Sequence, residues 1–209
     1  MTTTRAKTIR ATVKISLTAL ACTLLGLAAA RGMQPKKAAA ETTAAERVKR
    51  GAYLVTIGGC NDCHTPWKMG ERGPEPDLSR MLSGHPQEVA VKSLPSPQKG
   101  PWMVAAAATN TAWAGPWGVS FTANLTPDEN TGIGSWTEEI FINTLRTGKH
   151  WGQSRPLLPP MPWFNYGKMS DDDLKAVFAY LRTIPPVHNA VPLPIPPGGP
   201  DPNADPVWE

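Results

Sequence analysis

The stretch Cys60-Asn61-Asp62-Cys63-His64 decides the fold of this chain. Two thiols three positions apart, followed directly by a histidine, form the pattern through which a haem is attached covalently. The sulfurs reach the vinyl groups on one edge of the porphyrin, and the histidine offers its imidazole to the iron. The motif therefore predicts one covalent haem c, attached through Cys60 and Cys63, with His64 as an iron ligand.

The cysteine count excludes other uses of this motif. The chain has three cysteines, and the third, Cys22, lies in an N-terminal segment that we expect to be removed. A structural zinc site needs four ligands, usually in two pairs, and there is no second CxxC pair. A redox-active pair of the thioredoxin kind belongs to a βαβ setting, whereas the flanks here have helical patterns. A disulfide between Cys60 and Cys63 would close a very small loop and stabilise little.

Residues 1–40 have the pattern of a secretory signal peptide. Basic residues precede an apolar stretch from Ile15 to Ala30, and alanine triplets that end at Ala30 and Ala40 suit cleavage. The alternative is an N-terminal membrane anchor, because the apolar run is close to the shortest length that spans a bilayer. We therefore expect an exported, periplasmic protein, with a membrane tether as the alternative to cleavage.

Charge argues against a nucleic-acid partner. The whole chain has a net charge of +4, but residues 1–40 hold seven basic residues and no acidic ones. Without them, 14 basic residues face 17 acidic ones, a net charge of −3. The basic character thus belongs to the targeting segment, and the mature chain lacks the basic surface that nucleic-acid binding requires.

Three later segments have helix signals. The first starts at a capping box formed by Thr43 and Glu46 and ends at Gly58-Gly59, just before the haem motif. The second starts at Ser135–Glu138, which also matches a capping box, and ends at Thr147-Gly148. The third starts at Ser170 with three aspartates and stops before Pro185. We assign residues 41–187 to one domain, because the chain has one haem motif and no internal repeat.

The remaining segments are rich in proline. Residues 65–114 hold many prolines together with several tryptophans, which predicts an irregular but packed insertion. Nine of the last 25 residues are proline, so we expect residues 188–209 to form an extended tail, wrapped on the surface or loose.

Met161 is the strongest candidate for the second iron ligand. An electron carrier needs the sixth position of its iron filled, and methionine opposite histidine raises the reduction potential. Prolines on both sides stiffen the backbone at Met161, which lies between the second and third helices. Met69 lies too close to His64, and Met81, Met103 and Met169 suit packing better. His85 is the main rival, although a lone loop histidine is more often a surface residue. The sequence also leaves His150 and His188 as alternatives.

Several further motifs follow one another along the chain. They are Arg50-Gly51-Ala52-Tyr53-Leu54, Asn124-Leu125-Thr126-Pro127-Asp128, Thr131-Gly132-Ile133-Gly134-Ser135-Trp136, Leu145-Arg146-Thr147-Gly148, Pro160-Met161-Pro162-Trp163 and Ala179-Tyr180-Leu181-Arg182. Over residues 47–64 and 115–187 the chain resembles class I c-type cytochromes, especially the haem domains in cytochrome c subunits of bacterial periplasmic and membrane-bound dehydrogenases. Those subunits commonly carry three haem domains, whereas this chain has one haem motif.

The resemblance implies an all-α cytochrome c fold, here with a long insertion and a proline-rich tail. It implies that the first and last helices cross near Gly51, against Tyr180 or Leu181. It also implies His64 and Met161 as axial ligands. Trp136, with Asn130 and Arg146, would lie near the haem propionates, because buried carboxylates need hydrogen-bond donors.

These features together predict a one-electron carrier rather than an enzyme. Its partners would be a donor dehydrogenase and a downstream oxidase or cytochrome. The competing hypothesis is a haem c enzyme or ligand sensor whose sixth position is open or labile, for which His85 and His150 offer acid–base groups.

Overall fold

The structure is a computed structural model that describes residues 43–91, 103–199 and 202–203. The predicted signal peptide lies outside these residues and stays a prediction. The helices are α2 (Ala44–Ile57), α3 (Cys60–His64), α4 (Glu138–Thr147), α5 (Trp163–Tyr166) and α6 (Asp171–Leu181), with 3-10 turns η1 (Leu78–Arg80) and η2 (His150–Gly152). The strands are β1 (Trp67–Gly70), β2 (Gly73–Pro76), β3 (Ala105–Ala106), β4 (Ala112–Gly115) and β5 (Gly118–Phe121). None of the helices in the described part of the chain is long and apolar enough to cross a bilayer.

Local capping chemistry starts two of the three long helices where the sequence predicts. Thr43 and Glu46 form the reciprocal capping box of α2, and the Ser170 side chain accepts a hydrogen bond from Asp173 N at the start of α6. The capping box predicted at Ser135 is wrong, because α4 is capped by Thr137, whose side chain accepts from Ile140 N. Trp136 N donates to Ile133 O, so a separate turn lies just before this helix.

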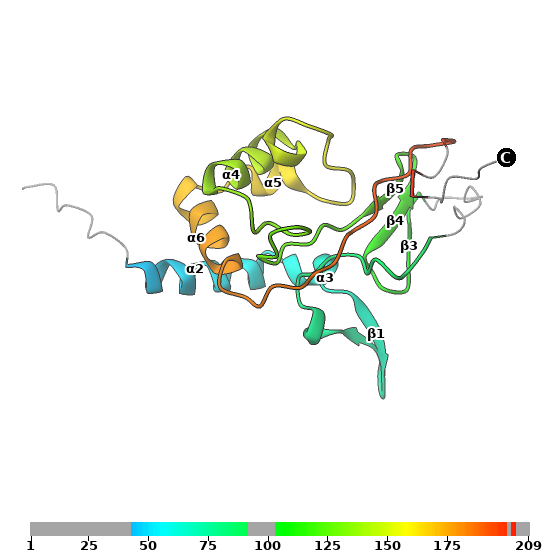
Figure 1. The fold of residues 1–209 in the computed structure, drawn as a ribbon, viewed down its shortest axis with the longest axis horizontal. Helices are drawn as coiled ribbons and strands as arrows, with labels where there is room; N and C mark the ends of the chain where they lie inside the picture. The colour runs from blue at the N-terminus through cyan, green and yellow to red at the C-terminus, as the bar shows by residue number, and fades with distance from the viewer. Residues whose placement is uncertain (1–42, 92–102, 200–201, 204–209) are drawn as a thin grey trace, which may run out of the picture. The chain divides into compact units, whose positions relative to one another are not determined.

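The crossing of α2 and α6 organises the helical part of the molecule (Figure 1). Gly51 lies at the contact, where a Cβ atom would come within 1.9 Å of Ala176 O and 2.8 Å of Tyr180 Cβ. Only glycine lets the two backbones approach this closely. The predicted crossing near Gly51 and Tyr180 is thereby confirmed.

A single hydrophobic core joins the three long helices. Its buried members come from α2, α4, α6 and the connecting loops: Leu54, Val55, Leu82, Ile133, Phe141, Leu145, Leu174, Ala176, Val177, Phe178, Leu181 and Ile184. Phe141 and Phe178 pack with ring centroids 5.4 Å apart, which joins α4 to α6. Burial of these apolar side chains is the main force that holds the helices together.

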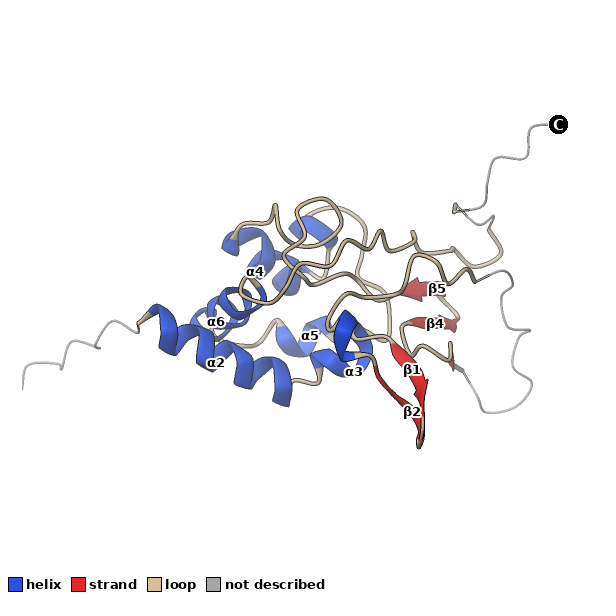
Figure 2. Ribbon diagram, turned by 60° about the horizontal axis from the view of Figure 1, so that its bottom comes forward, coloured by secondary structure: helices blue, strands red, loops and turns tan. Residues whose placement is uncertain are grey.

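The fold is mostly helical with minor strands, so the all-α prediction needs correction. The segment predicted to be irregular, residues 65–114, contains the antiparallel hairpin β1–β2 (Figure 2), the strand β3 and most of β4, which pairs with β5 just beyond it. Its prolines do not prevent this, because β1 and β2 are both edge strands, where Pro74 and Pro76 need not donate a ladder hydrogen bond.

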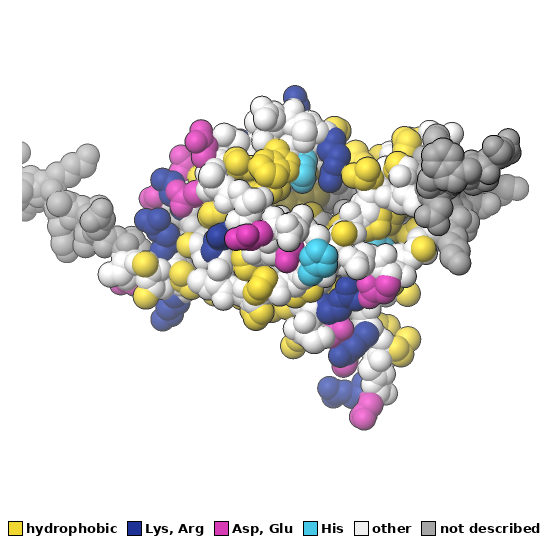
Figure 3. Space-filling model, in the orientation of Figure 1, with side chains coloured by type: hydrophobic (Ala, Val, Ile, Leu, Met, Phe, Trp, Pro, Cys, Tyr) yellow, Lys and Arg dark blue, Asp and Glu magenta, His cyan; other side chains and the backbone are white. Residues whose placement is uncertain are grey.

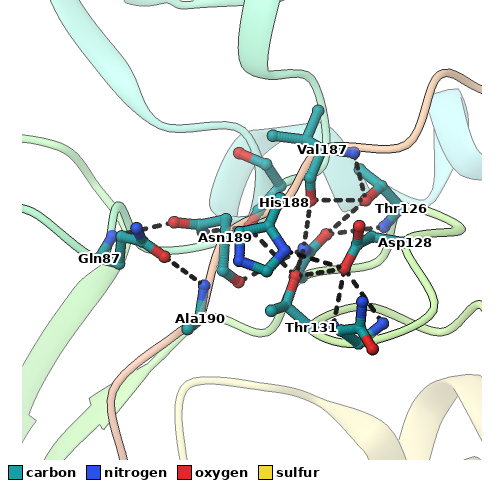
Figure 4. A network of polar contacts seen from close by, with 11 residues as sticks. Gln87, Thr126, Asp128, Thr131, Val187, His188, Asn189 and Ala190 are labelled. Atoms are coloured by element: carbon teal, nitrogen blue, oxygen red, sulfur yellow. Dashed lines mark hydrogen bonds and ion pairs between the residues drawn. The ribbon is translucent and has the colours of Figure 1, made fainter.

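The segment after α6 is packed against the body rather than loose. It runs from α6 to the strands, where Ile195 exchanges two backbone hydrogen bonds with Val119 of β5 (Figure 1). Asn189 has a fully buried side chain, which accepts from Gln87 N and donates to the carbonyl oxygens of Ser83 and His85. Asn189 N donates to Thr131 Oγ1 at 2.9 Å, and Figure 4 shows how Asn189 lies between Gln87 and Thr131. The tail therefore ties the 83–87 loop to the segment around Thr131.

Candidate haem site

The haem motif forms the short helix α3, which starts after Gly59 in a left-handed conformation. Because the helix repeats every 3.6 residues, Cys60 and Cys63 lie on one face, and both thiols are free. Burial raises the pKa of Cys60 to about 11, with smaller contributions from Asp62 and Cys63. Burial also raises the pKa of Cys63. Redox-active CxxC pairs need a lowered thiol pKa, so the environment of α3 argues against dithiol redox chemistry.

His64 is buried and held in one orientation. Its Nδ1 lies 2.7 Å from the backbone carbonyl oxygen of Ala123. A carbonyl can only accept, so Nδ1 carries the proton and Nε2 keeps a free lone pair. Burial lowers the pKa of His64, although the hydrogen bond to Ala123 acts in the opposite direction. A neutral imidazole with one nitrogen fixed in this way is the arrangement that metal-ligating histidines use.

Met161 lies in the loop between η2 and α5, half-buried against the same core as Cys60 and Trp136. Two hydrogen bonds fix the ends of this loop. The Tyr166 hydroxyl donates to Gly58 O at 2.5 Å, which ties α5 to the turn before the haem motif. Ser120 Oγ donates to Pro159 O at 2.5 Å, which ties the loop to β5.

Trp136 forms an aromatic cluster with η2. Its ring centroid lies 5.4 Å from that of His150 and 5.4 Å from that of Trp151. Burial lowers the pKa of His150, and the positive charge of Arg155 lowers it further. His150 is therefore neutral at neutral pH. Trp136 thus packs on His150 of η2, the turn that directly precedes the Met161 loop.

Arg146 is engaged with protein groups at the end of α4. Its guanidinium donates to Gly167 O and forms an ion pair with Asp171. Its predicted position near the propionates stays a prediction, as does that of Asn130, whose backbone N donates to Asp128 Oδ1.

His85 is not the surface residue that the sequence suggested. Its side chain is fully buried, with Nδ1 2.9 Å from Thr111 Oγ1 and Nε2 2.8 Å from Val89 O. Both ring nitrogens are engaged, so this imidazole has no free lone pair to offer to a metal. The side chain of His188 is exposed, and its Nδ1 lies 3.6 Å from Asp128 Oδ1.

The sequence did not reveal the partners that hold the two candidate ligands. Ala123 acts through its backbone carbonyl, which no side-chain pattern announces. Ser120 lies 39 residues before Pro159, and the Tyr166 hydroxyl reaches Gly58, 108 residues earlier in the chain. Nothing in the local sequence of either residue distinguishes it from an ordinary polar residue.

The residues fit a covalent haem. Two free thiols share one face of α3, and the imidazole of His64 has a free Nε2. Cys60 packs against the hydrophobic core, as Trp136 and Met161 do. Figure 3 shows one face of the molecule, with a hollow in which hydrophobic side chains gather. Among the described residues, no group of three or more histidine, cysteine, aspartate and glutamate side chains could hold a metal ion by itself.

Three relatives align with large parts of the chain. It is 27% identical to the fructose dehydrogenase cytochrome subunit of Gluconobacter japonicus over 169 residues, which are 81% of this chain and 28% of the relative. It is 30% identical to the gluconate 2-dehydrogenase cytochrome c subunit of Pantoea cypripedii over 144 residues, 68% of this chain and 24% of the relative. It is 27% identical to the alcohol dehydrogenase (quinone) cytochrome c subunit of Gluconobacter oxydans over 135 residues, 64% of this chain and 20% of the relative.

The chain spans about a quarter of the length of these relatives. No protein-family model matches it. The CxxCH motif and the fixed imidazole are what a cytochrome c subunit needs to hold its haem. The chain is a homologue of the cytochrome c subunits of bacterial fructose, gluconate and alcohol dehydrogenases.

Proposed function

We propose that this chain is a periplasmic electron carrier with one haem c, attached through Cys60 and Cys63 and ligated by His64 and Met161. The observation that carries the proposal is the buried His64, whose Nδ1 donates to Ala123 O and whose Nε2 is left free next to two thiols on one helix face. When bound, the haem supplies one-electron chemistry between its ferric and ferrous states.

The chain's own residues set the conditions for that chemistry. The hydrogen bond from His64 to Ala123 O fixes the ring orientation and increases the basicity of Nε2. The proline-flanked loop offers the thioether of Met161, which favours the reduced state. Trp136 and the apolar core exclude water from the site. We propose Trp136 and Arg146 as neighbours of the propionates.

The partners follow from the relatives, whose names describe subunits of dehydrogenases. We propose a donor dehydrogenase and a downstream oxidase or cytochrome as redox partners. Because the chain spans about a quarter of each relative, it would provide one haem domain where those proteins have room for several. The chain would act as an electron carrier and not as the enzyme that oxidises the substrate.

The alternative is a haem c enzyme or ligand sensor with an open or labile sixth position. His150 supports it, because this half-buried imidazole lies next to Trp136 and its lowered pKa keeps it available as a base. The electron-carrier proposal has more support, since the loop that bears Met161 is tied at both ends by buried or half-buried donors.

Three experiments test the proposal. After denaturation and acid-acetone extraction, the haem should stay with the polypeptide, and Cys63→Ala should prevent normal maturation. A reduced-form spectrum should be insensitive to carbon monoxide. Haem that moves into the solvent phase would overturn covalent attachment, and rapid carbon monoxide binding by the wild type would favour the enzyme or sensor.

A further inference from the structure

We infer that Ser120 is a positioning residue for Met161, acting through the backbone of the loop that presents the thioether. The inference rests on the proposed function, since it takes Met161 as the sixth ligand. Its basis is the buried hydroxyl of Ser120, which holds Pro159 O in the stretch Pro159–Pro162, where Met161 has the one backbone N–H.

Proline content makes this loop depend on donors from outside. Pro159, Pro160 and Pro162 have no backbone N–H, so none of them can tie the loop to neighbouring structure as a donor. Met161 N is the one donor in this stretch, and it is used locally, on Leu158 O at 3.2 Å. Backbone hydrogen bonds from neighbouring elements to the stretch Pro159–Pro162 therefore reach its carbonyl oxygens, whereas Leu157, just before it, donates to Gly148 O at 2.8 Å.

Ser120 supplies such a donor. The residue is 6% exposed, and its Oγ lies 2.5 Å from Pro159 O but 3.4 Å from Trp113 O. A hydroxyl has one proton, so it goes to the nearer acceptor. The indole of Trp117 lies 3.3 Å away and donates to the same Oγ, which orients the hydroxyl toward Pro159.

The strand that carries Ser120 is itself fixed on both sides. β4 pairs with β5 along one edge, and Ile195 of the tail exchanges hydrogen bonds of 2.8 and 3.0 Å with Val119 along the other. The hydroxyl is thus presented from a backbone that cannot easily move to follow the loop.

The segment that carries Ser120 also restrains His64, the other proposed iron ligand. Ala123, whose carbonyl accepts the proton of His64 Nδ1, lies three residues after Ser120 along extended backbone, a span of roughly 10 Å. One short segment therefore restrains both the proximal histidine and the loop of the distal methionine. Loss of the Ser120 hydroxyl should loosen the distal side alone.

The test compares ferric and ferrous holoprotein of the wild type, Ser120→Ala, Ser120→Thr and Thr122→Val. Thr122 is a matched control, because its hydroxyl lies nearby in the same segment, is buried and has no hydrogen-bond partner. The readouts are the near-infrared sulfur-to-iron charge-transfer band of the ferric protein, followed as pH rises, and the rate of carbon monoxide binding to the ferrous protein.

As pH rises, the charge-transfer band of Ser120→Ala should disappear at a lower pH than that of the wild type. Carbon monoxide should bind the ferrous variant roughly 2- to 10-fold faster than the wild type, as the loss of one ordinary hydrogen bond predicts. Ser120→Thr keeps a hydroxyl and should restore both properties. If the extra methyl group prevents folding, Ser120→Cys, a weaker donor of similar shape, should give intermediate values. Thr122→Val should behave as the wild type.

Ser120→Ala with an unchanged band and unchanged carbon monoxide kinetics would overturn the inference while methionine ligation stands. Equal effects of Ser120→Ala and Thr122→Val would overturn it as well, since the effect would then be general loosening. A wild type without the band would overturn methionine ligation itself, and the role of Ser120 with it.

Discussion

Replacement of Gly51 by alanine should force the crossed helices α2 and α6 apart. The new Cβ would lie 1.9 Å from Ala176 O and 2.8 Å from Tyr180 Cβ. Non-bonded heavy atoms rest at about 3.5 Å, so the two backbones would have to separate by roughly 1.5 Å at the crossing. The nearer atom is a backbone carbonyl oxygen of a helix, which cannot rotate away as a side chain could.

Two opposing contributions set the size of the effect. Overpacking of this kind costs about 3 kcal/mol at the upper end of its usual range. Alanine favours the helix over glycine by about 1 kcal/mol. We therefore expect a net loss of about 2 kcal/mol or more in the free energy of unfolding. For a domain of this size such a loss lowers the melting temperature by roughly 4–8 °C.

Urea denaturation of the holoprotein, followed by circular dichroism, measures this loss. Lys49→Gly is a suitable control, because Lys49 is exposed on the same helix and reports the cost of glycine without a clash. If Gly51→Ala is neutral or stabilising, then helix propensity outweighs the contact, and the close crossing of the helices is wrong.

Three further predictions concern the tail, an internal histidine and export. Asn189→Ala should lower the free energy of unfolding by about 2–4 kcal/mol, because Gln87 N, Arg80 Nη2, Ser83 O and His85 O each lose a buried partner; a loss below about 1 kcal/mol in urea denaturation would show that the tail is not an anchor. Burial lowers the pKa of His85 in the folded state, so the unfolded state binds more protons below about pH 6.5. The free energy of unfolding should therefore fall on acidification from that pH, by up to about 1.4 kcal/mol per pH unit, and His85→Gln should reduce the slope. Mass spectrometry of the mature chain should show that residues up to about Ala30 or Ala40 are missing, whereas an intact N-terminus would favour the anchor.

Sequence patterns predicted the parts of the fold that depend on local chemistry. Thr43, Glu46 and Ser170 cap helices where expected, because a cap depends on residues within one turn. At Ser135 the same pattern failed, since the turn from Ile133 to Trp136 delays the start of α4 to Thr137. A capping pattern alone does not reveal such a turn.

Non-local contacts were beyond prediction from the sequence. His85 is buried because Thr111, Val89 and Phe121 surround it, and all three lie in or near the segment that the sequence predicts to be irregular. The proline-rich tail carries Asn189, whose partners lie about a hundred residues earlier in the chain. Proline content predicted an extended backbone there but not what it contacts.

The candidate site likewise has residues that the sequence predicts and residues that only the fold reveals. Cys60, Cys63 and His64 follow from a contiguous motif, and the structure adds the carbonyl of Ala123 that fixes the imidazole. The flanking prolines of Met161 and its place between two helices predict it as the second ligand. The donors that hold its loop, Ser120 and Tyr166, became visible only with the fold.

The sulfur-to-iron charge-transfer band in the near-infrared spectrum of the ferric protein tests the central claim most directly. We predict that the wild type shows this band and that Met161→Ala loses it, with a lower reduction potential, an iron that binds carbon monoxide, and covalent haem still in place. A band that survives Met161→Ala would assign the ligand to another methionine. A wild type that lacks the band and binds carbon monoxide readily would contradict the account of a closed electron carrier.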